Sequence, residues 1–302
     1  MTQASTHEYT AEDVTKAFDE ITATLFAGKT AESTPKLLIT AGLQSSGKTY
    51  LLEKTLLPSK RYDSYVRLYL PEYRKKHPLY AEMIKLGELY AYEHTEAFVR
   101  EVSGKIHAEA FIRKLNIIME CAFDDIKFAS FPAIAQKAGY QFEIHIVGCT
   151  RTFAHVSSIK RGLKSLAAKE LERFVTLTAL DSSMSNAQAI LLAFETAAKA
   201  GNGSKISLYA RGFGKLKERT LCAETTYPET TGGEITETGS TKRYTYSAYD
   251  KIITNYVYAL EDRDELVKEC HLALHKIGTY AEKVPDVVYN DLYAYIVKYV
   301  YR

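Results

Sequence analysis

The stretch Lys36-Leu37-Leu38-Ile39-Thr40-Ala41 runs directly into Gly42-Leu43-Gln44-Ser45-Ser46-Gly47-Lys48-Thr49. Its first six residues are almost all apolar, which predicts a strand that is covered on both faces in a parallel sheet. The next eight residues have the spacing of a phosphate-binding loop, in which two glycines allow successive backbone N–H groups to converge on phosphate oxygens. A helix is expected to begin at the end of the loop, with its positive end toward the anion. The stretch therefore predicts an α/β fold of the P-loop class.

Each polar position of this loop has an expected role in binding a nucleotide. The Lys48 side chain would bring a positive charge to the phosphates and take part in catalysis, and the Thr49 hydroxyl would bind a magnesium ion. GTPases, motor and helicase ATPases and small-molecule kinases all share such a loop, so other residues must distinguish them. The residues that we expect to hold the nucleotide are Gly42, Gln44, Ser45, Ser46, Gly47, Lys48 and Thr49.

Short apolar segments alternate with helix-length stretches along much of the chain. This alternation is typical of βαβ units and predicts a doubly wound parallel sheet flanked by helices. We expect a kinase-like core at residues 1–215, with a leading helix at 11–26 and a lid. Residues 216–302 would add a loop or hairpin and a Tyr-rich helical extension packed on the core, and the Thr-, Glu- and Gly-rich residues 220–245 would be a surface hairpin or loop. Further strands are predicted at residues 65–70, 115–119, 142–147 and 205–210, and helices at 95–112 and 186–200.

The composition is that of an ordinary globular protein, with 39 Lys plus Arg against 37 Asp plus Glu in 302 residues. This near-neutral balance gives no general attraction to nucleic acid or anionic lipid, so neither is an expected partner. Four scattered cysteines without a CxxC pair argue against a zinc site or a disulfide framework. No leader-like N-terminus and no apolar run of about 18 residues is present, so we expect a cytoplasmic protein, in its own cell or in a target cell.

Two observations separate the nucleotide-binding classes. The Asn-Lys-x-Asp motif that reads the base in switch GTPases does not occur in the chain. The apolar segment 115–119 is followed by a single acid, Glu120, where motor and helicase ATPases usually have Asp or Asp-Glu. An acid at the carboxyl end of a parallel strand lies on the ligand side of the sheet, where it suits magnesium contact or capture of a substrate hydroxyl.

A series of motifs in the same order resembles the zeta-toxin kinases of bacterial toxin–antitoxin systems over roughly residues 36–185. The motifs are Thr34-Pro35-Lys36-Leu37-Leu38 before the loop, Glu72-Tyr73-Arg74-Lys75-Lys76-His77-Pro78, Glu120, the turn Lys137-Ala138-Gly139-Tyr140, the helix segment Ser158-Ile159-Lys160-Arg161, and Arg173 with Asp181. The resemblance implies an enzyme that uses ATP and Mg²⁺ to phosphorylate a sugar hydroxyl of a UDP-linked N-acetyl sugar such as UDP-N-acetylglucosamine. It also implies a small antitoxin or chaperone-like protein partner.

The same resemblance implies which residues are catalytic. A phosphoryl group in transfer spreads negative charge over its equatorial oxygens, and kinases supply cations to it from outside the phosphate loop. The resemblance implies that Arg161 and Arg173 contact the transferred phosphate and act together with Lys48 and Glu120.

The acceptor side departs from the family pattern. Pro71 stands where family members have the Asp that orients and deprotonates the acceptor hydroxyl, and Tyr69 replaces another common acid. Glu72 is the nearest substitute as a catalytic base, although an extended backbone before it would turn its side chain away. Asp124 and Asp125 are the second option. The alternatives therefore include a kinase for another acceptor, such as an NAD-like dinucleotide or a polynucleotide 5′-hydroxyl, and a nucleotide-binding regulator with little turnover.

Three other features have weaker interpretations. The tight loop at residues 211–215 follows a predicted strand at the ligand edge, where it would contact adenine or phosphate. The basic tract at residues 74–77 is interpreted as a solvated helix start. His145 and His155 are interpreted as part of a strand and of a helix face, and not as metal ligands.

Overall fold

The structure, a computed structural model, describes residues 8–300 except 69, 169–173 and 228–241. Its strands are β1 Lys36–Ala41, β2 Val66–Arg67, β3 Ile117–Cys121, β4 Gln141–Gly148, β5 Lys205–Ala210 and β6 Thr220–Thr226. Its helices are α1 Ala11–Leu25, α2 Lys48–Leu51, α3 Leu70–Arg74, α4 Tyr80–Leu86, α5 Glu88–His94, α6 Glu96–Ile112, α7 Phe131–Lys137, α8 Arg151–Ala168, α9 Leu177–Ala200, α10 Tyr246–Thr254, α11 Leu260–Ile277 and α12 Asp286–Val300. Shorter helical turns are η1 Leu52–Leu56, η2 Leu57–Ser59, η3 Ile126–Ser130, η4 Gly214–Leu216 and η5 Ala281–Lys283.

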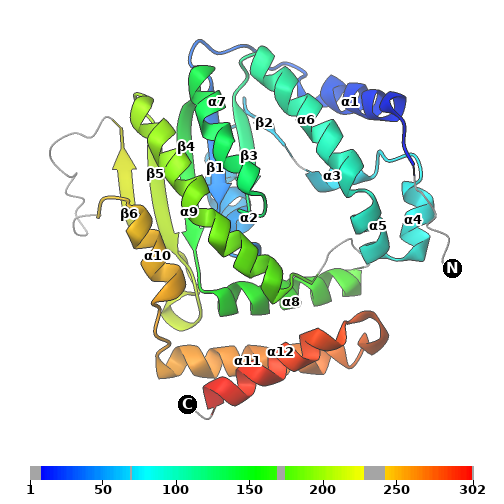
Figure 1. Ribbon diagram of the computed structural model, residues 1–302, viewed down its shortest axis with the longest axis vertical. Coiled ribbons are helices and arrows are strands. Elements are labelled where there is room, and N and C mark those ends of the chain that lie inside the picture. Colours follow the sequence, from blue (N-terminus) through cyan, green and yellow to red (C-terminus); the bar gives the residue numbers. More distant parts are fainter. Residues whose placement is uncertain (1–7, 69, 169–173, 228–241, 301–302) are drawn as a thin grey trace.

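The strands form one six-stranded sheet with the order β2-β3-β1-β4-β5-β6 (Figure 1). The first five strands in this order are parallel, and β6 pairs antiparallel with β5 at the edge. The central strand β1 lies between β3 and β4, so the chain order reverses there. Ligands of open α/β sheets bind at the carboxyl ends of the strands at such a point. The doubly wound sheet flanked by helices that the sequence predicts is confirmed.

Apolar side chains fix β1 from both faces of the sheet. Leu37 and Ile39 belong to the larger core, which includes buried residues of α6, α7 and α9. Leu38 points to the other face, where it packs in a smaller cluster with Leu51 and Leu52 from the helical segment after the loop. Because both faces are covered, the strand and the loop that follows it are held in one position.

The segment after β2 differs from the prediction. The strand comprises only Val66–Arg67, and the backbone of Leu70–Arg74 is helix α3. Pro71 falls in the first turn of this helix, where its missing N–H removes no helical hydrogen bond. The prediction of an extended backbone directly before Glu72 is therefore wrong.

Two further segments lie differently from the prediction. β3 begins and ends two residues later than residues 115–119, so Glu120 lies within the strand, beside Thr40 of β1. The first part of the predicted surface hairpin or loop is the edge strand β6, in which Ala223 and Thr225 are buried. The predicted region continues at residues 228–241, which lie outside the described residues.

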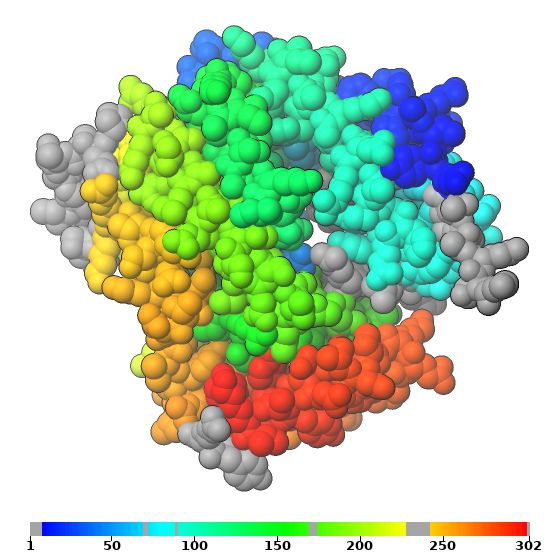
Figure 2. Space-filling model, in the orientation of Figure 1, coloured from blue at the N-terminus to red at the C-terminus, as the bar shows by residue number. Residues whose placement is uncertain are grey.

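The C-terminal helices α11 and α12 lie beyond α8, on the side of the sheet where the parallel strands end (Figure 1). α11 packs on α8 and on α12, and Leu266, Cys270 and Leu292 are buried in these contacts. Figure 2 shows the orange and red helices at the base of the molecule, against the green part of the chain. Within the described ranges, no helix is both long and apolar enough to cross a membrane.

Candidate active site

Two glycines shape the loop that follows β1. A Cβ on Gly42 would lie 2.5 Å from the Val147 carbonyl oxygen of β4. Gly47 has a φ of +96°, and a Cβ on it would lie 1.6 Å from Nη1 of Arg211. Other residues rarely adopt this left-handed backbone and carry the Cβ that would collide. Gly42 is thus required by the close approach of the β4 backbone, and Gly47 is favoured by its left-handed backbone, with the flexible Arg211 side chain in the space of an added Cβ.

Two serine hydroxyls in the loop are buried without a partner. Ser45 Oγ and Ser46 Oγ make no hydrogen bond with any described residue. Ser45 also has a φ of 63°, a left-handed conformation that is uncommon outside glycine. A buried polar atom without a partner costs free energy, and such atoms in a native fold call for a reason. Of the two, Ser45 lines the cavity at the loop, where its hydroxyl fits an oxygen of a bound phosphate.

Lys48 is buried at the start of α2. Its Nζ lies 3.4 Å from the Leu43 carbonyl oxygen, to which it donates. Burial lowers the pKa of the Lys48 ammonium, while the charge of Glu120 opposes this shift and that of Arg161 adds to it. A bound phosphate would favour the charged form, because an opposite charge stabilises an ammonium in a buried place.

Thr49 and Glu120 bring oxygen ligands together beside the loop. Thr49 Oγ1 donates a hydrogen bond of 2.6 Å to Glu120 Oε2. The other carboxylate oxygen of Glu120 lies 3.9 Å from Nη2 of Arg67. Mg²⁺ prefers oxygen ligands and is usually bound by one or two protein groups together with substrate phosphates and water. The Thr49 and Glu120 oxygens therefore fit a Mg²⁺ ion that a nucleotide brings with it.

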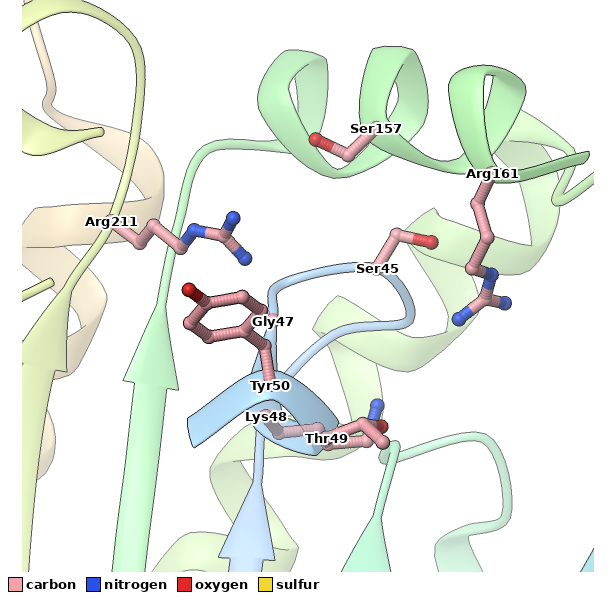
Figure 3. A pocket seen from close by; sticks show the side chains of 8 residues that line it. All are labelled: Ser45, Gly47, Lys48, Thr49, Tyr50, Ser157, Arg161 and Arg211. Carbon is pink, nitrogen blue, oxygen red and sulfur yellow. The ribbon is translucent and has the colours of Figure 1, made fainter. Parts of the chain in front are cut away.

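A cavity of about 260 Å³ opens at the loop (Figure 3). Arg161 points into it from α8 and Arg211 from the segment after β5, on opposite sides of the loop. Ser157 lies on the same face of α8 as Arg161, since residues four apart are neighbours on a helix surface. The lining residues are Ser45, Gly47, Lys48, Thr49, Tyr50, Ser157, Arg161 and Arg211.

Arg211 lines the site, although the sequence predicted only that its loop, residues 211–215, would contact adenine or phosphate. Its Nη1 donates to the Ser46 carbonyl oxygen at 3.1 Å, and its guanidinium lies over the Phe153 ring. Its Nε is buried without a hydrogen-bond partner among the described residues. Burial and the nearby charge of Arg219 lower the pKa of Arg211. The available sequence signal was its position directly after a parallel strand, at the edge where ligands bind.

The structure gathers some of the expected catalytic residues and not others. Lys48 and Arg161 line the cavity, and Glu120 adjoins it through its hydrogen bond to Thr49. Glu72 lies exposed on α3 and does not line the cavity. Gly42, Gln44 and Ser46 belong to the loop but do not line the cavity.

Arg173 lies outside the described residues. Asp181, which the resemblance to the family pairs with Arg173, forms an ion pair of 2.6 Å with Arg151 at the start of α8. Asp124, the alternative base, follows β3 by three residues, and its charge raises the pKa of Lys48. An acid of the β3 end therefore lies within electrostatic range of the loop.

The basic tract at residues 74–77 turns inward at two positions. Arg74 is buried, with its guanidinium bonded to Glu96 and to Thr95 Oγ1, and the buried His77 ring packs on Phe98. The prediction of a solvated helix start is wrong at these two residues, because α3 packs on α6. The placement of His145 in a strand and of His155 in a helix is confirmed.

The sheet, the loop and the cavity define an α/β protein of the P-loop class. The sequence pattern of the zeta toxin family matches residues 19–212. The chain therefore belongs to the zeta toxin family. No curated protein sequence matches it.

Solved structures share this fold at low sequence identity. One, from work on the PezAT chromosomal toxin–antitoxin system of Streptococcus pneumoniae, has a TM-score of 0.62 at 14% identity, over 92% of this chain and 100% of that chain. The AvrRxo1-ORF1:-ORF2 structure with ATP has a TM-score of 0.58 at 12% identity, over 94% and 88%. The structure of the same pair with sulphate ions has 0.55 at 13%, over 94% and 86%. At such identities the likeness shows the fold, and it confirms the fold that the resemblance implied.

Proposed function

We propose that the protein is an ATP-dependent kinase that transfers the γ-phosphate to a hydroxyl of a nucleotide sugar such as UDP-N-acetylglucosamine. The observation that carries this proposal is the cavity at the phosphate loop, with Arg161 and Arg211 pointing into it from two different elements. Cations on both sides of bound phosphates suit a reaction in which negative charge moves during phosphoryl transfer. Membership of the zeta toxin family supports the same chemistry.

ATP is the donor that we propose, and one structural relative was solved with ATP. In Figure 3, the Lys48 and Thr49 side chains extend toward the Arg161 side of the cavity, and Tyr50 lies on the Arg211 side. A Mg²⁺ ion brought by the nucleotide would be held by the Thr49 hydroxyl and would neutralise charge on the phosphates near it. We therefore place the γ-phosphate near Arg161, and the α-phosphate and nucleoside near Arg211.

The transfer step forms a bond between the acceptor oxygen and the γ-phosphorus and breaks the bond to the β–γ bridging oxygen. The electron pair of the broken bond stays on ADP, and the acceptor hydroxyl gives its proton to a base. Lys48 and Arg161 neutralise charge on the transferred group, and burial of Lys48 strengthens this interaction. When bound, Mg²⁺ would be held by Thr49 and Glu120 and would neutralise further phosphate charge.

We propose Asp124 as the base and keep Glu72 as the alternative. Glu72 and Asp124 are both exposed, and neither lines the cavity. Asp124 follows β3, the strand that carries Glu120, and the carboxyl ends of parallel strands are where ligands of such sheets bind, which supports this choice. Asp124 would then take the role of the acid that Pro71 replaces.

The altered acceptor side keeps other functions in view. We propose that Pro71 stands at the position of the family acid. This would favour a different hydroxyl acceptor, such as an NAD-like dinucleotide or a polynucleotide 5′-hydroxyl, or a regulator that binds nucleotide with little turnover. The structural relatives come from work on a toxin–antitoxin system and on an ORF1:ORF2 complex. We therefore also propose a small antitoxin or chaperone-like protein as partner, in the cytoplasm.

The test uses purified protein, Mg²⁺ and ATP labelled at the γ-phosphate, with UDP-N-acetylglucosamine, other UDP-sugars, NAD and a 5′-hydroxyl oligonucleotide as separate acceptors. We expect label on a nucleotide sugar. Lys48→Ala should lower the transfer rate at least about a hundredfold, because a buried charge at the reacting phosphate is lost. Lys54→Ala, which removes an exposed lysine from η1, is the matched control and should retain the rate.

If only NAD or only the oligonucleotide gains label, the acceptor is not a nucleotide sugar, and the labelled compound gives the acceptor class instead. MgATP binding without transfer to any acceptor would contradict the kinase and support the regulator. Equal activity of Lys48→Ala and Lys54→Ala would contradict the assignment of the site.

A further inference from the structure

Helix α8 lies between the phosphate loop and the C-terminal helices (Figure 1). Ser157 and Arg161 on one face of α8 line the phosphate cavity. Lys160 points to another face, because adjacent residues are about 100° apart around a helix. Its Nζ lies 2.5 Å from Oε2 of Glu269 on α11. The direction in which Arg161 points is therefore tied to the contact between α8 and α11.

Helix α11 also holds the segment that carries Arg211. Glu265, four residues before Glu269, accepts a hydrogen bond of 2.5 Å from the Gly214 N–H and one of 2.7 Å from Lys217 Nζ. Gly214 and Lys217 belong to the turn directly after Arg211. The two carboxylates of α11 lie on one face of the helix, since residues four apart are neighbours there.

A narrow cavity of about 90 Å³ marks where these contacts converge. Lys160 of α8 and both carboxylates of α11 line it, and it shares Ser157 and Arg211 with the phosphate cavity. Glu265 and Glu269 do not line the phosphate cavity itself. They lie behind the two segments that carry the arginines.

We propose that Glu265 and Glu269 are positioning residues, which hold Arg211 and Arg161 on opposite sides of the bound phosphates. This inference rests on the proposed kinase function. The carboxylates touch neither the phosphates nor the acceptor. They act through Lys160 on α8 and through the turn after β5.

The rest of the C-terminal segment anchors the first half of α8. The Tyr258 hydroxyl shares a hydrogen bond of 2.5 Å with Thr150 Oγ1, directly before the helix. The Tyr295 hydroxyl of α12 shares one of 2.9 Å with Nδ1 of the buried His155. With both tyrosines in place, loss of Glu269 changes the orientation of α8 near Arg161 without detaching the helix.

The expected effect is on rate more than on binding. The Lys160 side chain is 48% exposed, so its ion pair adds little to stability. Orientation matters more, because a misplacement of about 1 Å at a reacting group can cost about a hundredfold in rate. Phosphate contacts from the loop backbone and Lys48 remain when either carboxylate is removed.

The test compares Glu269→Gln and Glu265→Gln in the full chain. We expect kcat to fall about 10- to 100-fold in each variant, while the Kd for MgATP changes less than about threefold. Glu195→Gln is the matched control. Glu195 on α9 bonds Lys199 at 2.8 Å with exposed fractions of 13% and 48%, close to the 17% and 48% of the Glu269 and Lys160 pair. The control should keep kcat within about twofold.

Two further measurements separate positioning from a merely structural role. The double variant Lys160→Glu with Glu269→Lys restores the ion pair and should recover most of kcat. Hydrogen exchange of the α8 amides, which needs no turnover, should be faster in Glu269→Gln and unchanged in Glu195→Gln.

Unchanged kcat in both carboxylate variants would overturn the proposal, and so would a loss of kcat matched by an equal loss of MgATP binding. Absence of transfer by the unaltered protein would instead contradict the kinase function. In that case the hydrogen-exchange measurement alone decides whether Glu269 of α11 holds α8 in position. Equal exchange in Glu269→Gln and Glu195→Gln would overturn this role of Glu269.

Discussion

The guanidinium of Arg211 occupies the space that a Cβ on Gly47 would need. Gly47→Ala must therefore push this flexible side chain away from the loop. We expect MgATP to bind more than about tenfold more weakly, since a charge-assisted contact to the phosphates is lost. Equilibrium binding of MgATP measures this.

Gly139→Ala supplies the control for backbone strain. Gly139 also has a positive φ, +84°, but nothing lies within 4 Å of its added Cβ. We expect this variant to lose about 1 kcal/mol of unfolding free energy and to bind MgATP normally. An equal loss of binding in both variants would show that strain, and not Arg211, is responsible.

The identity of the base is also decided at single residues. We expect Asp124→Asn to lower kcat about 10²- to 10⁴-fold, since a base that accepts the acceptor proton is removed. Glu72→Gln should lower kcat less than about threefold, because under this proposal Glu72 on α3 takes no part in the proton transfer. Initial rates with the labelled acceptor measure both. A larger loss of kcat in Glu72→Gln than in Asp124→Asn would return the role of base to Glu72.

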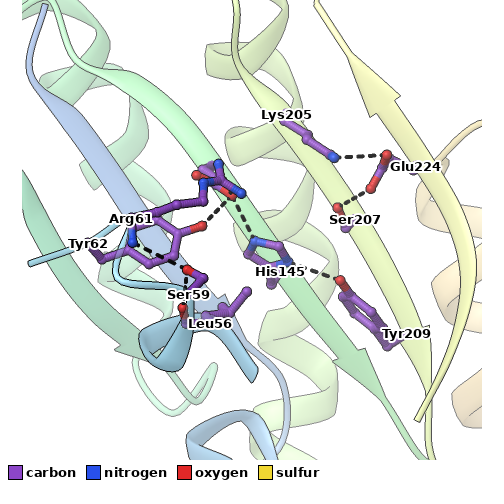
Figure 4. A network of polar contacts seen from close by, with 10 residues as sticks. Leu56, Ser59, Arg61, Tyr62, His145, Lys205, Ser207, Tyr209 and Glu224 are labelled. Atoms are coloured by element: carbon purple, nitrogen blue, oxygen red, sulfur yellow. Dashed lines mark hydrogen bonds and ion pairs between the residues drawn. The ribbon is translucent and has the colours of Figure 1, made fainter. Parts of the chain in front are cut away.

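At the scale of the element, β4 carries polar side chains that contact the segment after η2 on one side and the neighbouring strand β5 on the other (Figure 4). The Glu143 carboxylate accepts a hydrogen bond of 2.7 Å from the Tyr62 hydroxyl and lies 3.2 Å from His145 Nε2 and 3.6 Å from Arg61. His145 also shares a hydrogen bond with the Tyr209 hydroxyl of β5. The network thus links the segment after the phosphate loop to two strands.

This network makes part of the stability depend on pH. Burial alone would raise the pKa of Glu143, but hydrogen bonds from His145 and Tyr62 and the charges of His145 and Arg61 outweigh it and lower the pKa to about 2. A carboxyl with a lowered pKa stabilises the fold at every pH above its ordinary pKa of about 4.3. This stabilisation is lost as the pH falls toward the lowered pKa.

We therefore expect Glu143→Gln to lower the unfolding free energy by about 1–3 kcal/mol at about pH 7, with the difference from the unaltered protein shrinking between about pH 5 and pH 3. Chemical denaturation at each pH measures it. Glu109→Gln, which removes a partly exposed i,i+4 pair with Arg113 at the end of α6, should cost less than about 0.5 kcal/mol. A constant difference for Glu143→Gln down to pH 3 would contradict the lowered pKa.

For the whole molecule, the sequence predicted what is encoded locally. The strand Lys36–Ala41, its loop and the strand Lys205–Ala210 were predicted with their observed bounds, because apolar runs and glycine spacing act over a few residues. α6 was also found within one residue, with Thr95 as its N-cap. α9 begins earlier than predicted, at Leu177.

Contacts between distant segments were not predictable in this way. Arg211 meets Ser46 across 165 positions, and the bonds of Glu265 and Glu269 depend on how α11 packs against the core. The helix at Pro71 was missed because tertiary packing overrides weak local preference. Residues 220–245 were predicted as a surface hairpin or loop, and the pairing of β6 with β5 at the sheet edge agrees with the hairpin. The Arg173 assignment and the domain division at residue 215 stay predictions.

The order of the sheet also bears on how the protein is made. β1 leaves the ribosome early, yet Leu37 pairs with Ile117 on one side and with Phe142 on the other. Parallel pairing of such distant segments is slow, and an unpaired apolar strand is prone to aggregate. We therefore expect the nascent chain to need chaperone protection until residue 148 has emerged, and the ability to hold a nucleotide to arise late in synthesis.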